Sequence, residues 1–221
     1  MGSAWVSLGT DVLGYPVQRV QWRLGDRLAR RQRSGMDHHD QMPEPTPTEI
    51  SITIYCPQVL RDLWCSPPDH PAHGQLSGQW YAQYPGLFDK QDLRMARTQW
   101  DKHFYEWFAT IHLFQRYGAC SMVEKYDQPS HVRKYERYAR MVPEDQLLKL
   151  KAITEEQILE EDGKYHGVQL PDLFVPSRDE SSFYFAEVKG GSDRLRPRQT
   201  MSHEEIRKMD LKVKVIQVEL V

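Results

Sequence analysis

Apolar residues follow helical spacing in one long segment and strand-like spacing in several shorter ones. Between residues 92 and 117 they recur at every third or fourth position, which predicts an amphipathic helix that Gly118 terminates. A second helix is predicted at 197–209, where Pro197 opens a polar stretch. Short runs rich in β-branched and aromatic residues predict strands at 49–55, 119–126, 167–175, 183–189 and 212–220.

The order of these elements indicates an α/β fold. From residue 92 onward, the order is helix, strand, insertion, strand, strand, helix, strand. The insertion, at about 127–166, is predicted to be helical because Pro143-Glu144-Asp145 is typical of a helix start. We therefore expect a mixed central sheet flanked by helices, with a helical insertion.

The first 91 residues differ from the rest. Residues 1–48 combine clustered arginines with alternate prolines, which predicts a flexible basic tail. Residues 49–91 form an N-terminal extension of uncertain fold, in which the predicted strand is followed by a Pro- and Gly-rich loop at 67–87. The compact core is assigned to residues 92–221.

Composition excludes some classes of protein. The chain has 221 residues, and 29 Lys and Arg against 31 Asp and Glu leave a net charge of −2, which excludes a globally basic nucleic-acid coat. Three cysteines do not suit a disulfide framework, and no apolar run is long enough to span a membrane. We therefore expect a cytoplasmic protein without a membrane partner.

One arrangement of residues has weak metal-ligand character. Cys56, Cys65, His70 and His73 offer zinc-type ligands, but structural zinc sites use two close pairs and these cysteines lie too far apart. We favour buried cysteines and exposed histidines, and keep zinc as an alternative.

Charged residues in two predicted strands form the strongest candidate site. Glu187 and Lys189 are two positions apart and share a strand face, and a short hairpin brings Asp172 of the preceding strand beside them. Their neighbours are apolar, so these charges are expected to be buried at a cost that favours function over a surface salt bridge. Carboxylate oxygens are the ligands that Mg²⁺ prefers.

These residues resemble a known family. The elements Pro171-Asp172, Glu187-Val188-Lys189-Gly190, Ser192-Asp193-Arg194-Leu195 and Arg198-Gln199 are similar to those of the PD-(D/E)xK nuclease superfamily, and within it to the VRR-Nuc domain family. The resemblance implies a restriction-endonuclease-like fold with an αβββαβ core. It also implies a Mg²⁺- or Mn²⁺-dependent nuclease, of the kind found in DNA repair or recombination and in phage or defence systems.

The resemblance assigns a role to each matching residue. Asp172, Glu187 and the main-chain carbonyl of Val188 would bind the metal ion, and Lys189 would position the attacking water. Gln199 matches a glutamine that faces the active site, while Asp193 and Arg194 would fix the loop before the last helix.

The family usually has a Glu on the first core helix as a further metal ligand. Alignment on Phe104 puts Asp101 there, at the edge of the apolar stripe, and Glu106 is nearer the predicted solvent side. We favour Asp101 as the catalytic and metal-binding helix acid, with Glu106 as the alternative. One-metal and two-metal sites both remain open.

DNA is the expected partner. Residues 189–214 contain eight Lys and Arg against four Asp and Glu, and backbone contacts come from such residues. The insertion adds a second basic segment at 131–140. We expect a structure-selective endonuclease for junctions or flaps, and a homodimer if the junctions are symmetric. The alternatives are a restriction-type enzyme that reads DNA through residues 49–90, and a catalytically silent relative. The predicted nucleic-acid contacts are Arg194, Arg196, Arg198 and Lys208.

Overall fold

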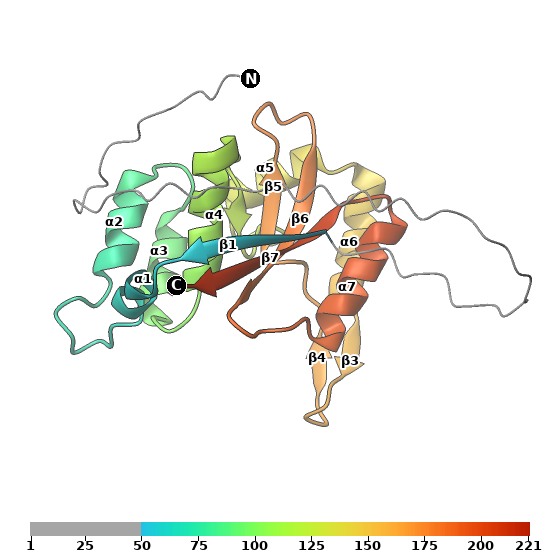
Figure 1. The fold of residues 1–221 in the computed structure, drawn as a ribbon. Helices are drawn as coiled ribbons and strands as arrows, with labels where there is room; N and C mark the ends of the chain where they lie inside the picture. Colours follow the sequence, from blue (N-terminus) through green and yellow to red (C-terminus); the bar gives the residue numbers. More distant parts are fainter. Residues whose placement is uncertain (1–49) are drawn as a thin grey trace, which may run out of the picture. The chain divides into compact units, whose positions relative to one another are not determined.

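A five-stranded mixed sheet forms the centre of the protein. The computed structural model describes residues 50–221 (Figure 1). The three longest strands run parallel to one another, and the two remaining strands each pair antiparallel to their neighbour. In spatial order the strands are β1 (Ile50–Cys56), β7 (Val213–Leu220), β6 (Phe183–Gly190), β5 (Leu173–Pro176) and β2 (Met122–Val123).

Helices cover both faces of this sheet. Phe185 and Ala186 are adjacent in β6 and therefore point to opposite faces, and each belongs to a different apolar core. The Ala186 core is shared with α1 (Gln58–Trp64), α2 (Gln75–Gln83), α3 (Lys90–Thr98) and α4 (Phe104–Tyr117). The Phe185 core is shared with α5 (Val132–Met141), α6 (Glu144–Glu155) and α7 (Pro197–Lys208).

The predicted fold class is confirmed. The αβββαβ order corresponds to α4, β2, β5, β6, α7 and β7, and the helical insertion corresponds to α5 and α6 (Figure 1). Pro143 lies at the N-cap of α6, as predicted. No helix within residues 50–221 is long and apolar enough to cross a membrane.

The predicted long helix at 92–117 is instead two helices. Asp89 accepts a hydrogen bond from the Asp92 backbone N–H in a capping box, so α3 starts at Lys90. α4 begins only after His103, whose φ of 63° is incompatible with a continuous right-handed helix. Trp100 therefore lies in the connecting turn rather than on the apolar stripe.

The predicted strand at 167–175 is also divided. Its first residue ends a separate hairpin, made of β3 (Gln157–Leu159) and β4 (Tyr165–Gly167), that sequence periodicity did not indicate. Pro171 lacks a backbone N–H and stands just before the second part, β5. Asp172 consequently lies at the entrance to β5 rather than in the middle of a strand.

Two further predictions differ in extent. The strand at 119–126 is reduced to the two residues of β2, and the loop at 67–87 contains α2. The segment 50–91 contributes more than an appendage, because β1 pairs in parallel with β7 along its whole length. The predicted tail at 1–48 lies outside the described residues.

Candidate active site

Strand register places Asp172 beside Glu187. Leu173 pairs with Ala186 in the β5–β6 ladder, so the residue before Leu173 is opposite the residue after Ala186. Asp172 Oδ2 accepts a hydrogen bond from the Val188 backbone N–H at 2.8 Å, which fixes its carboxylate against β6. The main-chain carbonyl of Val188 is the third predicted metal ligand. Val188 lies between Glu187 and Lys189 in β6, at the point of the sheet that Asp172 faces.

Lys189 and Gln199 hold the carboxylate of Glu187. Lys189 Nζ lies 2.8 Å from Glu187 Oε1 and 2.8 Å from Gln199 Oε1, and Gln199 Nε2 donates to the same Glu187 oxygen. Gln199 is in the first turn of α7 and its Oε1 also accepts from the Arg196 backbone N–H at 3.0 Å. The start of α7 therefore places one side chain against both charged residues of β6.

His203 is a further neighbour of Glu187 that the sequence analysis missed. It lies one turn beyond Gln199 on α7, it is 1% exposed, and its Nε2 is 3.8 Å from Glu187 Oε2. The i, i+4 spacing of Gln199 and His203 was a usable signal, because residues at this spacing share a helix face.

Three carboxylates influence one another at this site. Burial, and then the negative charges of Glu187 and Glu106, raise the pKa of Asp172 well above its usual range. Burial also acts to raise the pKa of Glu187, but contacts with His203 and Lys189 outweigh it and lower that pKa. A set of buried carboxylate oxygens that repel one another fits a divalent cation with oxygen ligands, such as Mg²⁺.

Glu106, rather than Asp101, is the carboxylate that α4 places near Asp172. Asp101 is exposed in the turn before α4, so the expectation that it lies on the helix is wrong. Glu106 is in the first turn of α4, and its Oε2 atom is buried with no hydrogen-bond partner. Burial, followed by the charge of Glu124, raises the pKa of Glu106 to about 7. The preference for Asp101 assumed a helix that extends back beyond Phe104, whereas α4 begins at Phe104.

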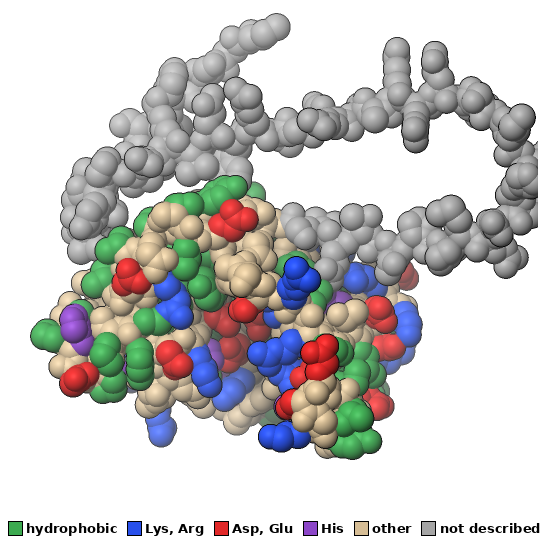
Figure 2. All heavy atoms as spheres, turned by 60° about the horizontal axis from the view of Figure 1, so that its bottom comes forward, with side chains coloured by type: hydrophobic (Ala, Val, Ile, Leu, Met, Phe, Trp, Pro, Cys, Tyr) green, Lys and Arg blue, Asp and Glu red, His purple; other side chains and the backbone are tan. Residues whose placement is uncertain are grey.

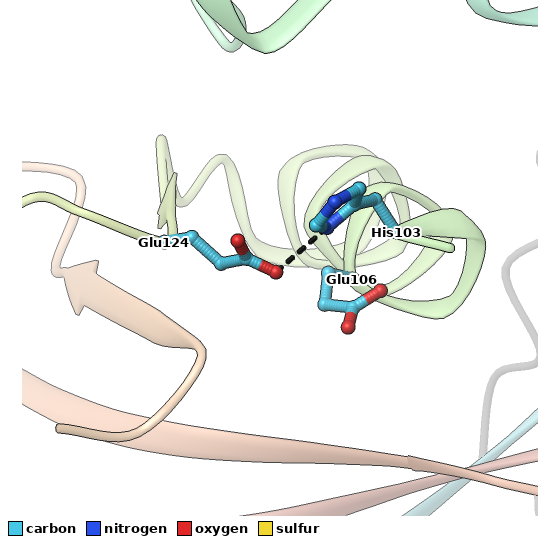
Figure 3. Close-up of side chains that lie close together, drawn as sticks. All are labelled: His103, Glu106 and Glu124. Carbon is cyan, nitrogen blue, oxygen red and sulfur yellow. Dashed lines mark hydrogen bonds and ion pairs between the residues drawn. The ribbon is translucent and has the colours of Figure 1, made fainter. Parts of the chain in front are cut away.

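Glu106 also belongs to a second group of side chains, again missed from the sequence. His103 Nδ1 lies 2.7 Å from Glu124 Oε1, and Glu106 lies beside this pair (Figure 3). His103 and Glu106 flank the start of α4 at i, i+3 spacing, whereas Glu124 follows β2. We call His103, Glu106 and Glu124 the His–Glu–Glu cluster.

The predicted DNA-contacting residues are distributed unevenly around the site. Arg194 and Arg196 are exposed just before α7, and Arg196 is the N-cap residue of that helix. Arg198 is half-buried and its Nη1 lies 3.5 Å from Glu160 Oε2. Lys208 is exposed at the opposite end of α7 and pairs with Glu205. Figure 2 shows a face on which recessed acidic side chains are bordered by Lys and Arg.

The basic residues at 131–140 of the insertion form ion pairs and hydrogen bonds within the protein. Arg137 and Arg140 pair with Glu180 at 2.8 and 2.7 Å, and Arg133 donates to the Gly86 carbonyl at 3.0 Å. Lys134 is buried in an ion pair with Asp92. These intramolecular contacts make the insertion a weaker candidate for DNA contact than the residues before α7.

The alternative zinc ligands do not form a group. Cys56 is buried at the end of β1, and His73 Nδ1 lies 2.8 Å from the Ser66 carbonyl oxygen. Within residues 50–221, the only three or more His, Cys, Asp or Glu side chains that converge at ligand distance are those of the His–Glu–Glu cluster.

The comparison with protein families agrees with the arrangement of β5, β6 and α7. The model of the VRR-NUC domain family matches residues 109–220, which are 112 of the 221 residues. The matched range includes Asp172, Glu187, Lys189 and Gln199, and it begins after Glu106. No curated protein matches the chain. Since the family match covers more than half of the sequence, the protein belongs to the VRR-NUC domain family, a PD-(D/E)xK-like nuclease family.

Proposed function

We propose that the protein is a metal-dependent DNA endonuclease that hydrolyses phosphodiester bonds at junctions or flaps. The observation that carries this proposal is the convergence of Asp172, Glu187 and Lys189 at one point of the sheet. Gln199 forms hydrogen bonds with both Glu187 and Lys189. Family membership supports the reaction class, and the contacts among these residues support their roles.

Asp172, Glu187 and the Val188 carbonyl are the proposed ligands of Mg²⁺ or Mn²⁺. The buried, unpartnered Oε2 of Glu106 fits a role as an additional ligand from α4, in place of Asp101. A bound divalent ion would lower the pKa of a coordinated water and offset charge that develops on the phosphate. The mutual repulsion of the carboxylates supports this assignment, because a cation would relieve it.

Lys189 is proposed to orient the attacking water or the scissile phosphate. Lys189 is 8% exposed, and its ammonium group donates hydrogen bonds to two acceptors, Glu187 Oε1 and Gln199 Oε1. A fixed cation in a water-poor site stabilises developing negative charge more strongly than a mobile one. Gln199 would position both residues, since its amide contacts each of them.

Arg194 and Arg196 are the best placed of the predicted DNA contacts. Both are exposed, and they lie in the loop that connects β6, which carries Lys189, to α7, which carries Gln199. Arg198 and Lys208 already have acidic partners, so their contribution to DNA binding is expected to be smaller. Segment 50–91 supplies buried Trp64 and Trp80 to the core, which favours a structural role over target recognition.

Cleavage assays with the full chain test this proposal. Labelled four-way junction, flap, single-stranded and linear duplex DNA are incubated with Mg²⁺, Mn²⁺ or EDTA. We expect cutting of junction or flap DNA only with metal, and a loss of at least about 100-fold in rate for Asp172→Ala and Lys189→Ala. Asp145→Ala and Lys149→Ala, which alter an exposed pair on α6, are the matched controls.

Two results would contradict the proposal. Metal-dependent cutting that survives both active-site substitutions would place the chemistry elsewhere or in a contaminant. DNA binding without cleavage of any substrate would support a catalytically silent relative.

Light scattering at several concentrations, with and without a symmetric junction, tests the expected homodimer.

A further inference from the structure

The His–Glu–Glu cluster encloses a small cavity. One ring nitrogen of His103 and one carboxylate oxygen from each of Glu106 and Glu124 all lie within 4.8 Å of one another. They line a cavity of about 10 Å³, together with apolar and polar neighbours from α3 and β2. A volume of roughly 10–15 Å³ accommodates one water-sized particle. The cavity is therefore of the right size for a single ion.

A separate observation points to a ligand. The Oε2 atom of Glu106 is buried and has no hydrogen-bond partner within residues 50–221, although buried carboxylate oxygens are costly to leave unpaired. The side chains of His103 and Glu124 are only 13% and 26% exposed, so water does not freely solvate the group. An ion at this position would supply the missing partner of Glu106.

The histidine is held in the way that metal-binding histidines usually are. Its Nδ1 faces Glu124 while its Nε2 lies 2.9 Å from the side-chain oxygen of Gln99. A polar contact to the second ring nitrogen fixes the ring orientation at metal sites. Glu124 is fixed as well, because its backbone N–H donates to the Asp172 carbonyl at 2.8 Å.

The ligand set indicates the class of ion. One imidazole nitrogen with two carboxylates suits Mn²⁺ or Zn²⁺, whereas an all-oxygen set suits Mg²⁺. We propose that His103, Glu106 and Glu124 form a binding site for a divalent transition-metal ion, next to the all-oxygen site at Asp172 and Glu187 and sharing Glu106 with it. The two sites would differ in metal preference although they are coupled through the charge of Glu106.

Neighbouring charges are compatible with this site. Lys134 is a buried cation next to this site, and its ammonium pairs with Asp92, which also lines the cavity. Its charge is therefore offset, and the two glutamates leave a net negative environment for a cation. His103 precedes the range matched by the family model and Glu124 lies inside it, and neither residue has a role in the family resemblance described above.

Mn²⁺ binding to the full chain tests the proposal without any assay of cleavage. The metal-free Asp172→Asn/Glu187→Gln variant is titrated with Mn²⁺, and free Mn²⁺ is followed by electron paramagnetic resonance. We expect one bound Mn²⁺ per chain that about 100-fold excess Mg²⁺ does not displace. Adding His103→Asn or Glu124→Gln should weaken this binding at least about 10-fold. His112→Asn, on the same helix, and Glu136→Gln are the matched controls.

Pulsed electron paramagnetic resonance of Mn²⁺ bound to the wild-type chain gives a second measurement, which does not depend on how a variant folds. A ¹⁴N hyperfine coupling to bound Mn²⁺ is expected from the imidazole of His103, and its loss in His103→Asn but not His112→Asn would assign it. No bound Mn²⁺ in the Asp172→Asn/Glu187→Gln variant, or no ¹⁴N coupling, would overturn the proposal. Failure of the nuclease proposal would instead appear as absent cleavage while this binding persists.

Discussion

Asp172 combines a structural hydrogen bond with an unfavourable charge. Its Oδ2 accepts from the Val188 N–H, yet burial and the carboxylates of Glu187 and Glu106 disfavour its ionised form. Removing the charge while keeping an acceptor oxygen should therefore stabilise the metal-free protein. Such a gain in stability at the expense of activity is common at active sites.

We predict that Asp172→Asn raises the free energy of unfolding in EDTA at pH 8 by about 1–3 kcal/mol. The Asn side-chain oxygen can still accept from Val188, whereas Asp172→Ala removes the acceptor and should gain less. Thermal and urea unfolding of the three proteins measure this. A lower stability for Asp172→Asn than for wild type would show that the carboxylates do not repel one another in the folded chain.

His203 is predicted to act as a positioning residue for Glu187. It approaches Oε2 of that carboxylate, while Lys189 and Gln199 hold the other oxygen. We expect His203→Asn to lower the rate of DNA cleavage about 10- to 100-fold and to raise the metal concentration needed for half-maximal rate, with little change in DNA affinity. Kinetics across a Mn²⁺ series measure both effects. An equal loss at all metal concentrations would contradict positioning of a metal ligand.

The residue-level site was largely predictable where its members lie on regular strands. Glu187 and Lys189 share a face of β6 because side chains alternate along a strand, and Gln199 follows Pro197 at a clear helix start. Glu106, His103 and Glu124 were not predictable in the same way. Their approach depends on a helix start shifted by a positive φ at His103 and on a two-residue strand, β2, neither of which leaves a periodic signal.

At the scale of elements, α4 and β6 approach each other closely at Gly190. A Cβ atom added there would lie 2.1 Å from Cε2 of Tyr105, a contact that real side chains do not make. Gly190 directly follows Lys189, so a displacement of α4 at this point would also disturb Glu106. The glycine is needed for the close approach, since its φ is not in the left-handed region.

We predict that Gly190→Ala destabilises the fold by about 1–3 kcal/mol through overpacking. The same substitution in a Tyr105→Ser background should cost much less, because the clashing ring is absent. Gly167→Ala in β4, where an added Cβ meets nothing within 4 Å, is the matched control. Urea unfolding of the four-member cycle measures the coupling; equal costs in both backgrounds would exclude the steric explanation.

Elements were predicted best where burial is continuous. β6, α7 and β7 were located to within one or two residues, because the two strands are rich in apolar residues and Gly190 and Pro197 mark the end of β6 and the start of α7. The break between α3 and α4 was missed because the aromatic spacing continues across it. The β3–β4 hairpin was missed because its residues are half-buried or exposed, so no apolar pattern distinguishes it from a loop.

At the scale of the molecule, a buried ion pair connects three segments that are distant in sequence. Lys134 of α5 pairs with Asp92 of α3, and its ammonium also donates to the Val123 carbonyl of β2 at 2.7 Å. The two side chains are 5% and 4% exposed. This contact attaches the helical insertion to the helices on the opposite face of the sheet, next to the His–Glu–Glu cluster.

Removing one charge of this pair should lower the free energy of unfolding far more than removing both charges. Lys134→Met leaves Asp92 as an unpaired buried charge, for which we predict a loss of about 3–5 kcal/mol at pH 8. Asp92→Asn/Lys134→Met retains an oxygen that accepts from the Asp89 N–H and should lie within about 2 kcal/mol of wild type. Urea unfolding measures both. Additive losses in the double variant would show that the two residues act independently.

The pH dependence of this pair follows from the state of Asp92. Burial raises the pKa of Asp92 from 3.8 to about 6 even though Lys134 lowers it, so the folded protein holds the proton more tightly than the unfolded chain. The associated stability is fully present below pH 3.8 and is lost as pH rises through about 6, a change of roughly 3 kcal/mol at 1.36 kcal/mol per unit. Lys134→Met removes the opposing charge, so its deficit against wild type should grow between pH 5 and pH 8. Unfolding free energies of both proteins across that range measure the effect, and a constant deficit would mean that Asp92 does not titrate there.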